Sequence, residues 1–180
     1  MNNLATLVFA PSFLIALSFF PLAETAFFAA MLVFLWIIIQ VYKEGLTRSL
    51  AVPLIYFLFT LGAALMDSLN LIKNIPLLIS ILFFLMFVGA VIGKKRMVLG
   101  FVKRFYPKEL SHAEVRYLSA SDLYWAMVTG ANSMVQWVVI TYFSLQVWAF
   151  YSSVGWYILF AVAGIAHYLY GRFYALRLLA

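Results

Sequence analysis

Residues 75–96 read IPLLISILFFLMFVGAVIGKKR, and this stretch decides the kind of fold. Its first part, Ile75–Gly93, contains no charged residue. It is long enough to cross the hydrocarbon core of a bilayer, which takes about 17–25 mostly apolar residues in a helix. The cations Lys94, Lys95 and Arg96 follow directly. An apolar segment that ends in a cluster of positive charge is typical of a membrane span with a cytoplasmic end.

The whole chain shares this apolar character. Of its 180 residues, 67% are hydrophobic and only 10% are charged, and the mean hydropathy is +1.04. Soluble domains are about half apolar and about a quarter charged. A soluble fold of this size could not bury so much apolar surface, because small domains leave much of their chain exposed. We therefore expect an all-α fold, a polytopic transmembrane helix bundle that forms a single domain over residues 1–180.

Apolar segments of sufficient length recur along the chain and predict about six spans. They cover Leu4–Leu22, Ala26–Tyr42, Leu50–Met66, Ile75–Gly93, Leu123–Phe143 and Tyr151–Gly171. The first two are joined by the short connection Ala23–Thr25 and could instead form one broken hydrophobic hairpin. No Lys or Arg precedes the first apolar segment, so we expect a retained span there and not a secretory signal.

The basic residues predict the orientation of these spans. Lys and Arg remain in cytoplasmic connections. In a six-span layout with both termini in the cytoplasm, eleven of the twelve Lys and Arg residues lie on the cytoplasmic side, and only Lys73 lies opposite. The formal net charge of +6 is then mainly a signal of topology, and we expect no nucleic-acid partner.

The segment 94–122 between the fourth and fifth spans is the one sizeable cytoplasmic part, and its start predicts an amphipathic helix. One helical face carries Val98, Phe101, Val102 and Phe105. The opposite face carries Arg96, Gly100, Lys103 and Arg104. Such a helix lies in the membrane interface near anionic headgroups. Anchoring to membrane lipids is the favoured role, and docking of an acidic partner is the alternative. The candidate lipid- or partner-binding residues are Arg96, Lys103, Arg104 and Arg116.

Pro107 is expected to end this helix, and Ser111 with Glu114 matches a capping box that opens a second short helix, His112–Leu118. Asp122 is then expected to open the fifth span. The acidic and histidine side chains of this segment could in principle bind metal or support acid–base chemistry. Metal sites need three or four convergent ligands, and capping explains these residues without chemistry. We therefore expect no metal, no cofactor and no catalytic residue.

Polar residues also occur inside two spans, where they are costly and often functional. Four of them share one face of the fifth span at i, i+3, i+4 and i+7: Thr129, Asn132, Ser133 and Gln136. Hydrogen bonding between helices is the favoured role for this face, and a substrate pathway is the alternative. His167 in the sixth span could relay protons, meet a lipid phosphate or cap a neighbouring helix.

A set of motifs in the second half of the chain is similar to a known family. These motifs are Pro107–Leu110, Val115–Tyr117, Trp125, Asn132 and Trp148 with Tyr151 behind it. From about Val98 to its end, the chain resembles uncharacterised bacterial inner-membrane proteins whose genes lie beside acyl carrier proteins, ketosynthases and acyltransferases in aryl-polyene-type lipid clusters. The septation protein A family is a looser match in the last spans. The resemblance implies a protein of the bacterial inner membrane in an envelope or lipid pathway, and it implies no particular activity.

Three functions follow as hypotheses. The first is an accessory protein for envelope lipid or acyl-chain assembly, with membrane lipids and an acidic carrier protein as partners of its basic segment. The second is a small transporter or exporter that uses the polar face of the fifth span. The third is a structural scaffold that binds septation or envelope-synthesis proteins. An enzyme is the least favoured class, because no acid, base and nucleophile converge and no P-loop, HExxH or GxSxG motif occurs.

Overall fold

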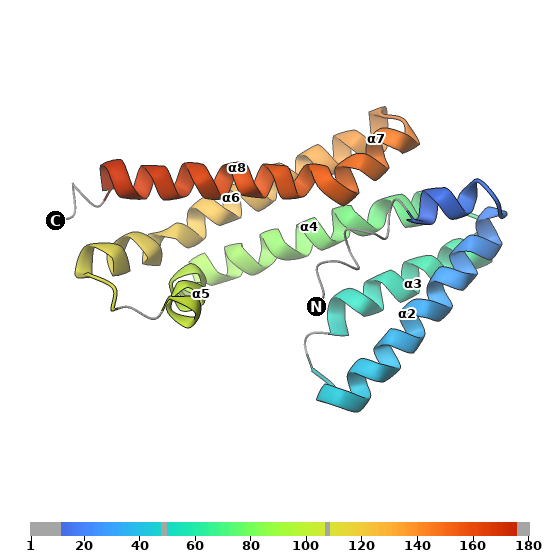
Figure 1. Ribbon diagram of the computed structural model, residues 1–180, viewed down its shortest axis with the longest axis horizontal. Coiled ribbons are helices and arrows are strands. Elements are labelled where there is room, and N and C mark those ends of the chain that lie inside the picture. The colour runs from blue at the N-terminus through green and yellow to red at the C-terminus, as the bar shows by residue number, and fades with distance from the viewer. Residues whose placement is uncertain (1–11, 48–49, 107–108, 176–180) are drawn as a thin grey trace. The chain divides into compact units, whose positions relative to one another are not determined.

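The computed structural model describes residues 12–47, 50–106 and 109–175, and these residues form helices and contain no strand (Figure 1). The α-helices are α2 (Leu22–Glu44), α3 (Ala51–Met66), α4 (Leu69–Ile92), α5 (Met97–Phe105), α6 (His112–Tyr142), α7 (Leu145–Phe150) and α8 (Trp156–Tyr170). Two π-helical turns, η2 (Tyr151–Gly155) and η3 (Gly171–Ala175), flank α8. Of the expected first span, Leu4–Leu22, residues 4–11 lie outside the described residues; residues 12–17 are helical, and a turn at 18–20 separates them from α2.

Among the residues that the structure describes, three helical segments are long and apolar enough to cross a membrane. They are Leu22–Glu44, Leu69–Ile92 and the continuous stretch Leu145–Phe173. Only 17–22% of the most apolar window of each is buried within the protein. An apolar surface of that extent needs lipid or a partner to cover it. The folded chain is therefore compatible with a membrane protein.

Two further expected spans, Leu50–Met66 and Leu123–Phe143, lie on α3 and α6. Neither helix combines the length and the hydropathy that a membrane crossing takes. α3 has 16 residues, slightly fewer than the roughly 17 that a crossing takes. α6 has 31 residues, but its polar face lowers its hydropathy, and α6 is not among the candidate spans. The length and hydropathy of the described helices therefore do not confirm about six spans.

Several expected helix boundaries are wrong. Ala23–Thr25 is not a connection, because α2 already begins at Leu22. α4 begins at Leu69 and includes Pro76 in its interior, a position that membrane helices tolerate. The separate short helix His112–Leu118 does not exist, since α6 runs unbroken from His112 to Tyr142 and contains no Pro. Asp122 accordingly lies inside α6 and does not open a helix.

The contacts within the chain divide it into two compact units. Unit 1 comprises residues 1–79 and 136–155, and unit 2 comprises residues 80–135 and 156–180. In unit 1, α2 and α3 lie side by side as a hairpin (Figure 1), with the rings of Phe34 and Phe57 5.4 Å apart. Small side chains such as Ala26 and Ala63 are fully buried and allow the close approach that helix pairs in membranes use.

Lys73, the exception to the charge pattern, has a structural role in unit 1. Its ammonium Nζ donates a hydrogen bond to the carbonyl oxygen of Ile140, 3.1 Å away, in the last turn of α6. The indole Nε1 of the fully buried Trp148 donates to the carbonyl oxygen of Lys73 at 3.1 Å. A cation is favourable at a helix C-terminus, where carbonyl groups lack helical partners. Lys73 therefore supplies a hydrogen-bond donor and a positive charge to the C-terminal end of α6.

The substitution Lys73→Met tests this role, because it keeps an unbranched apolar stem and removes the donor to Ile140. We expect a loss of stability of about 1.5–3 kcal/mol, the value of a hydrogen bond from a charged group. The thermal unfolding midpoint of the purified protein in mild detergent measures it. Lys95→Met removes an exposed lysine and serves as the control. Equal midpoints for the two variants would contradict the assigned role.

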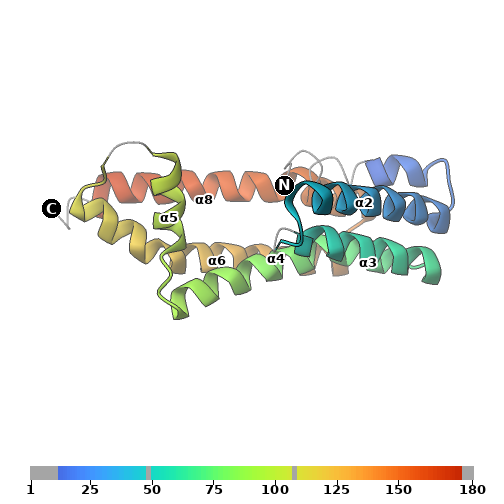
Figure 2. The same cartoon turned by 90° about the horizontal axis from the view of Figure 1, so that it is seen from below.

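In unit 2, α6 lies alongside both α4 and α8 in the two views (Figures 1 and 2). Two phenols of α6 donate to carbonyl oxygens of α8: Tyr117 to His167 at 2.7 Å and Tyr124 to Ala163 at 2.8 Å. The Tyr117 ring packs so closely on Gly171 that a Cβ there would lie 2.6 Å from a ring carbon. η3 begins at this glycine, four residues after the carbonyl that Tyr117 occupies. Figure 2 also shows α5 crossing the direction of α6 at a steep angle.

Candidate functional site

Asp122 joins α5 to α6. Its side chain is only 3% exposed. Its carboxylate oxygens Oδ2 and Oδ1 accept hydrogen bonds from the backbone N–H groups of Met97 and Val98, each at 2.9 Å. These N–H groups belong to the first turn of α5, where no helical acceptor exists, and a negative charge there is favourable. The N-cap residue Arg96 offers no side-chain hydrogen bond of its own. Asp122 therefore replaces the missing cap from another helix.

The turn from α4 to α5 has an unusual backbone. Lys94 and Arg96 both have a φ of 50°, in the left-handed region that favours glycine. α4 closes with hydrogen bonds from Lys94 N to Val91 O at 3.2 Å and from Lys95 N to Ala90 O at 2.9 Å. Helices often end in this pattern, with glycine at the left-handed position that Lys94 occupies here. Each such non-glycine residue costs about 1 kcal/mol or more and persists only where its surroundings impose it.

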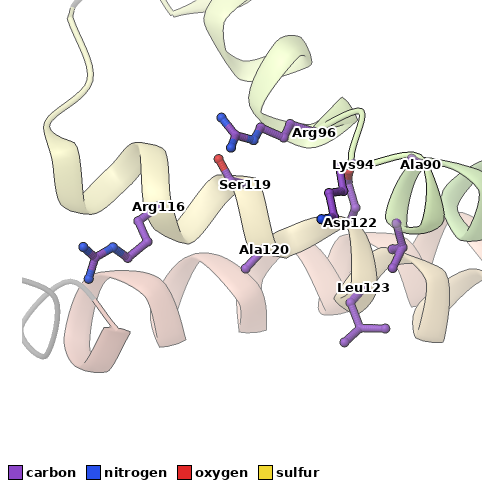
Figure 3. Close-up of a pocket in the computed structure, with 9 residues that line it drawn as sticks. Ala90, Lys94, Arg96, Arg116, Ser119, Ala120, Asp122 and Leu123 are labelled. Carbon is purple, nitrogen blue, oxygen red and sulfur yellow. The ribbon is translucent and has the colours of Figure 1, made fainter.

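A pocket of about 420 Å³ lies where this turn meets α6 (Figure 3). Its lining comes from the end of α4, the turn and the first half of α6: Ala90, Val91, Lys94, Arg96, Arg116, Ser119, Ala120, Asp122 and Leu123. Three cations and one carboxylate line it, so the pocket is electropositive. In Figure 3 the Arg96 guanidinium projects over the Ser119 hydroxyl. Arg116 lies about one turn before Ser119, nearer the start of α6.

The expected basic residues separate into two groups. All four are exposed, but Arg96 and Arg116 line the same pocket, whereas Lys103 and Arg104 lie on α5 and are not among its lining residues. Lys94, Ser119 and Asp122 also line the pocket and are not among the site residues expected from the sequence. A signal for the α6 side was present, because Arg116, Ser119, Ala120 and Leu123 follow i, i+3, i+4 and i+7 spacing.

α5 presents aromatic side chains away from the protein. Leu99 is its buried residue, at 6% exposure. Phe101 and Phe105 are 66% and 69% exposed, and their ring centroids lie 4.8 Å apart. The expected apolar face is therefore largely unpacked against the described part of the chain. α5 ends at Phe105, while Pro107, expected to end it, lies outside the described residues.

The expected capping box is confirmed. Glu114 Oε2 accepts from Ser111 N at 2.7 Å, and Glu114 N donates to Ser111 Oγ at 3.3 Å. Glu114 and Asp122 thus both use their carboxylates on helix N-termini. Among residues 12–47, 50–106 and 109–175, no group of three or more His, Asp or Glu side chains is arranged to hold a metal ion.

The polar face of α6 is largely engaged in hydrogen bonds. Asn132 Nδ2 donates to Ser80 Oγ of α4 at 2.7 Å, and Ser133 Oγ lies 3.0 Å from the same oxygen. Thr129 donates to the carbonyl oxygens of its own helix. Gln136 is 2% exposed, and its Oε1 has no hydrogen-bond partner within the described residues. Hydrogen bonds between helices thus account for Asn132 and Ser133, while one oxygen of Gln136 has no such explanation.

His167 lies among aromatic rings in unit 2. Its ring centroid is 4.9 Å from that of Tyr117, 4.8 Å from that of Tyr124 and 6.2 Å from that of Trp125. Its Nε2 lies 2.8 Å from Ser121 Oγ, and Ser121 Oγ donates to Tyr117 O at 3.0 Å. Because the single hydroxyl proton is used there, we assign Nε2–H as the donor to Ser121. The histidine then joins α8 to α6, and Ser121 is not set up as an activated nucleophile.

Comparisons of the chain with known protein families, with curated protein sequences and with solved structures find no match. The interpretation of the basic pocket and of α5 therefore depends on their own geometry and chemistry.

The substitution Asp122→Ala tests the attachment of α5. Removing the carboxylate leaves Met97 N–H and Val98 N–H without an acceptor, so we expect α5 to open at least tenfold more often. Each hydrogen bond to a charged group contributes about 1.5–3 kcal/mol. Hydrogen exchange of the α5 amides in detergent measures the opening.

Glu114→Ala is the matched control, because it removes a capping carboxylate from α6 only. We expect faster exchange at the start of α6 in that variant and unchanged exchange in α5. Unchanged protection of α5 in Asp122→Ala would show that other contacts hold this helix.

Proposed function

We propose that the chain is a multi-pass protein of the bacterial inner membrane and an accessory to envelope lipid or acyl-chain assembly. The observation that carries the proposal is α5, a helix with exposed aromatic and basic side chains that crosses the direction of α6 (Figure 2). The proposal includes about six spans with both termini in the cytoplasm. The apolar, mostly unburied surfaces of the three long helices support the membrane location.

The orientation of α5 supports an interfacial role. If α6 crosses the bilayer, a helix at a steep angle to it lies close to the membrane plane. The exposed rings of Phe101 and Phe105 would then enter the boundary between headgroups and acyl chains. Lys103 and Arg104, exposed in the last turn of α5, would lie at the level of phosphates and of the adjacent cytoplasm. Each such cation near an anionic surface contributes about 1 kcal/mol.

An acidic carrier protein is the partner that we propose for Lys103 and Arg104. The family that the second half of the chain resembles has genes beside those of acyl carrier proteins. Opposite charge on two surfaces speeds their encounter and fixes their orientation. A carrier held at α5 would deliver its acyl chain next to the apolar surfaces of the bundle. The accessory role consists of that placement, and it needs no catalytic group.

The transporter alternative is favoured by one observation only, the buried and unpaired Oε1 of Gln136. The neighbouring polar side chains Asn132 and Ser133 already bind Ser80. A substrate would have to displace those bonds between helices. The scaffold alternative stays a prediction.

The topology is testable because the sequence contains no cysteine. Asp67→Cys and Glu109→Cys each place a single thiol at an exposed position. We expect a membrane-impermeant maleimide to label Asp67→Cys in intact spheroplasts and to label Glu109→Cys only after permeabilisation. The two connections lie on opposite sides in the proposed layout. Labelling of both thiols from the outside, or of neither, would contradict it.

The double substitution Lys103→Glu/Arg104→Glu tests the carrier partner. Reversing two charges should weaken the binding of purified acyl carrier protein to the protein in nanodiscs by at least tenfold, because like charges at an interface cost several kcal/mol. Biolayer interferometry at low salt measures the affinity. Lys43→Glu/Arg172→Glu changes the net charge equally at two other exposed, proposed cytoplasmic positions. An equal loss of affinity in both variants, or no loss in the first, would contradict binding of the carrier at Lys103 and Arg104.

A further inference from the structure

We infer that the pocket between the α4–α5 turn and α6 binds the phosphate group of an amphiphile, with Lys94, Arg96 and Arg116 as its anion ligands. The inference rests on the proposed membrane location and is independent of a carrier partner. It concerns residues other than Lys103 and Arg104, to which the proposed function assigns the docking role. In Figure 3 Lys94 and Arg96 lie at the turn, whereas the exposed Arg116 guanidinium on α6 points away from them and would turn toward the phosphate on binding.

The charges of the pocket favour an anion. Three cations line it, and its only carboxylate, Asp122, uses both oxygens on the N–H groups of Met97 and Val98. A guanidinium presents several N–H donors in a plane, a geometry that matches phosphate oxygens in pairs. The Ser119 hydroxyl donates to the carbonyl oxygen of Val115 at 2.6 Å. The anion donors of the pocket are therefore the ammonium of Lys94 and the two guanidinium groups.

The other half of the lining is apolar, which indicates that the phosphate is attached to an apolar chain. Ala90 and Val91 come from α4, and Ala120 and Leu123 come from α6. The pocket lies at the C-terminal end of α4, and the preceding part of α4 is an apolar helix of which little is buried. A volume of about 420 Å³ is at the lower end of small-molecule sites. It suits a headgroup with the first part of a chain, and the remainder of the chain would follow α4 into lipid.

The backbone of the turn that carries Lys94 and Arg96 is held in place before any ligand arrives. Lys94 is fixed on one side by the closing hydrogen bonds of α4, and Met97 is fixed on the other by Asp122. Between these two constraints, Lys94 and Arg96 keep left-handed φ angles that a lysine or an arginine rarely adopts. Such outliers often occur at ligand sites, where the surrounding structure imposes them. A turn whose backbone is already fixed loses less freedom on binding than a mobile one.

The test uses delipidated protein in mild detergent and native mass spectrometry with three probes. The probes are phosphatidic acid, diacylglycerol with the same acyl chains, and inorganic phosphate. We expect phosphatidic acid to bind at least tenfold more tightly than either of the others. Equal binding of phosphatidic acid and diacylglycerol would overturn the phosphate site. Inorganic phosphate that binds as tightly as phosphatidic acid would overturn the apolar chain and indicate a soluble phosphate as the ligand.

Variants locate the site. Arg96→Gln and Arg116→Gln should each weaken the binding of phosphatidic acid about tenfold, since a hydrogen bond to a charged group contributes about 1.5–3 kcal/mol and each 1.4 kcal/mol is tenfold. Lys43→Gln/Arg172→Gln removes two exposed charges outside the pocket and should change binding less than about twofold. An equal loss in this control would overturn the inference in favour of general surface charge.

Two further variants keep the test decisive if Arg96→Gln or Arg116→Gln unfolds. Arg116→Lys keeps the charge and loses the planar fork, so a measurable loss of affinity relative to the unsubstituted protein is expected. Thr141→Ala removes a hydroxyl that is bonded within α6 and lies outside the pocket, and it should leave affinity unchanged. Unchanged affinity in Arg116→Lys, or an equal loss in Thr141→Ala, would contradict the role assigned to Arg116. Carrier binding at Lys103 and Arg104 is measured separately, so either proposal can fail alone.

Discussion

The two hydrogen bonds between the Asp122 carboxylate and the first turn of α5 determine the arrangement of the basic end of unit 2. They attach a nine-residue helix that is too short to be stable by itself in water. They also fix where the chain leaves α4, and with it the positions of Lys94 and Arg96. With one side of α5 held at Leu99, Phe101 and Phe105 face outward. The pocket and the interfacial helix are thus two consequences of one buried carboxylate.

The spacing of residues in the sequence predicted features within single helices. It did not predict the contacts between helices. The capping box of Ser111 and Glu114 and the amphipathic start of the 94–122 segment are patterns over three to seven residues, and both correspond to observed features. Asp122 bonds to backbone groups 24 and 25 residues earlier, across a turn with two left-handed residues. No periodicity encodes such a turn, because lysine and arginine are not the residues expected there. That Arg96 and Arg116 line one pocket was unpredictable for the same reason.

The polar residues that make the span count uncertain also hold helices together. Asn132 lowers the hydropathy of α6 and binds Ser80 of α4. Lys73 departs from the distribution of basic residues and binds the end of α6. In a hydropathy average, Asn132 and Lys73 only lower the value, because the average does not include their hydrogen-bond partners. Within a bundle each cost is offset by a hydrogen bond, often worth about 1 kcal/mol or less in membrane helices. Length and hydropathy therefore underestimate helices whose polar faces are paired inside.

Positive charge by itself is weak evidence for a ligand in a chain of this kind, because topology alone requires Lys and Arg at cytoplasmic helix ends. Lys103 and Arg104 on α5 are such charges, and they do not line the pocket of Lys94, Arg96 and Arg116. Topology does not require that Lys94 and Arg96 adopt costly left-handed conformations, nor that Arg116 lie on the same face of α6 as apolar residues that line the same cavity. A chain under selection for topology alone would place glycine at Lys94 and remove that cost. The backbone geometry, more than the charge, distinguishes a binding site from an orientation signal.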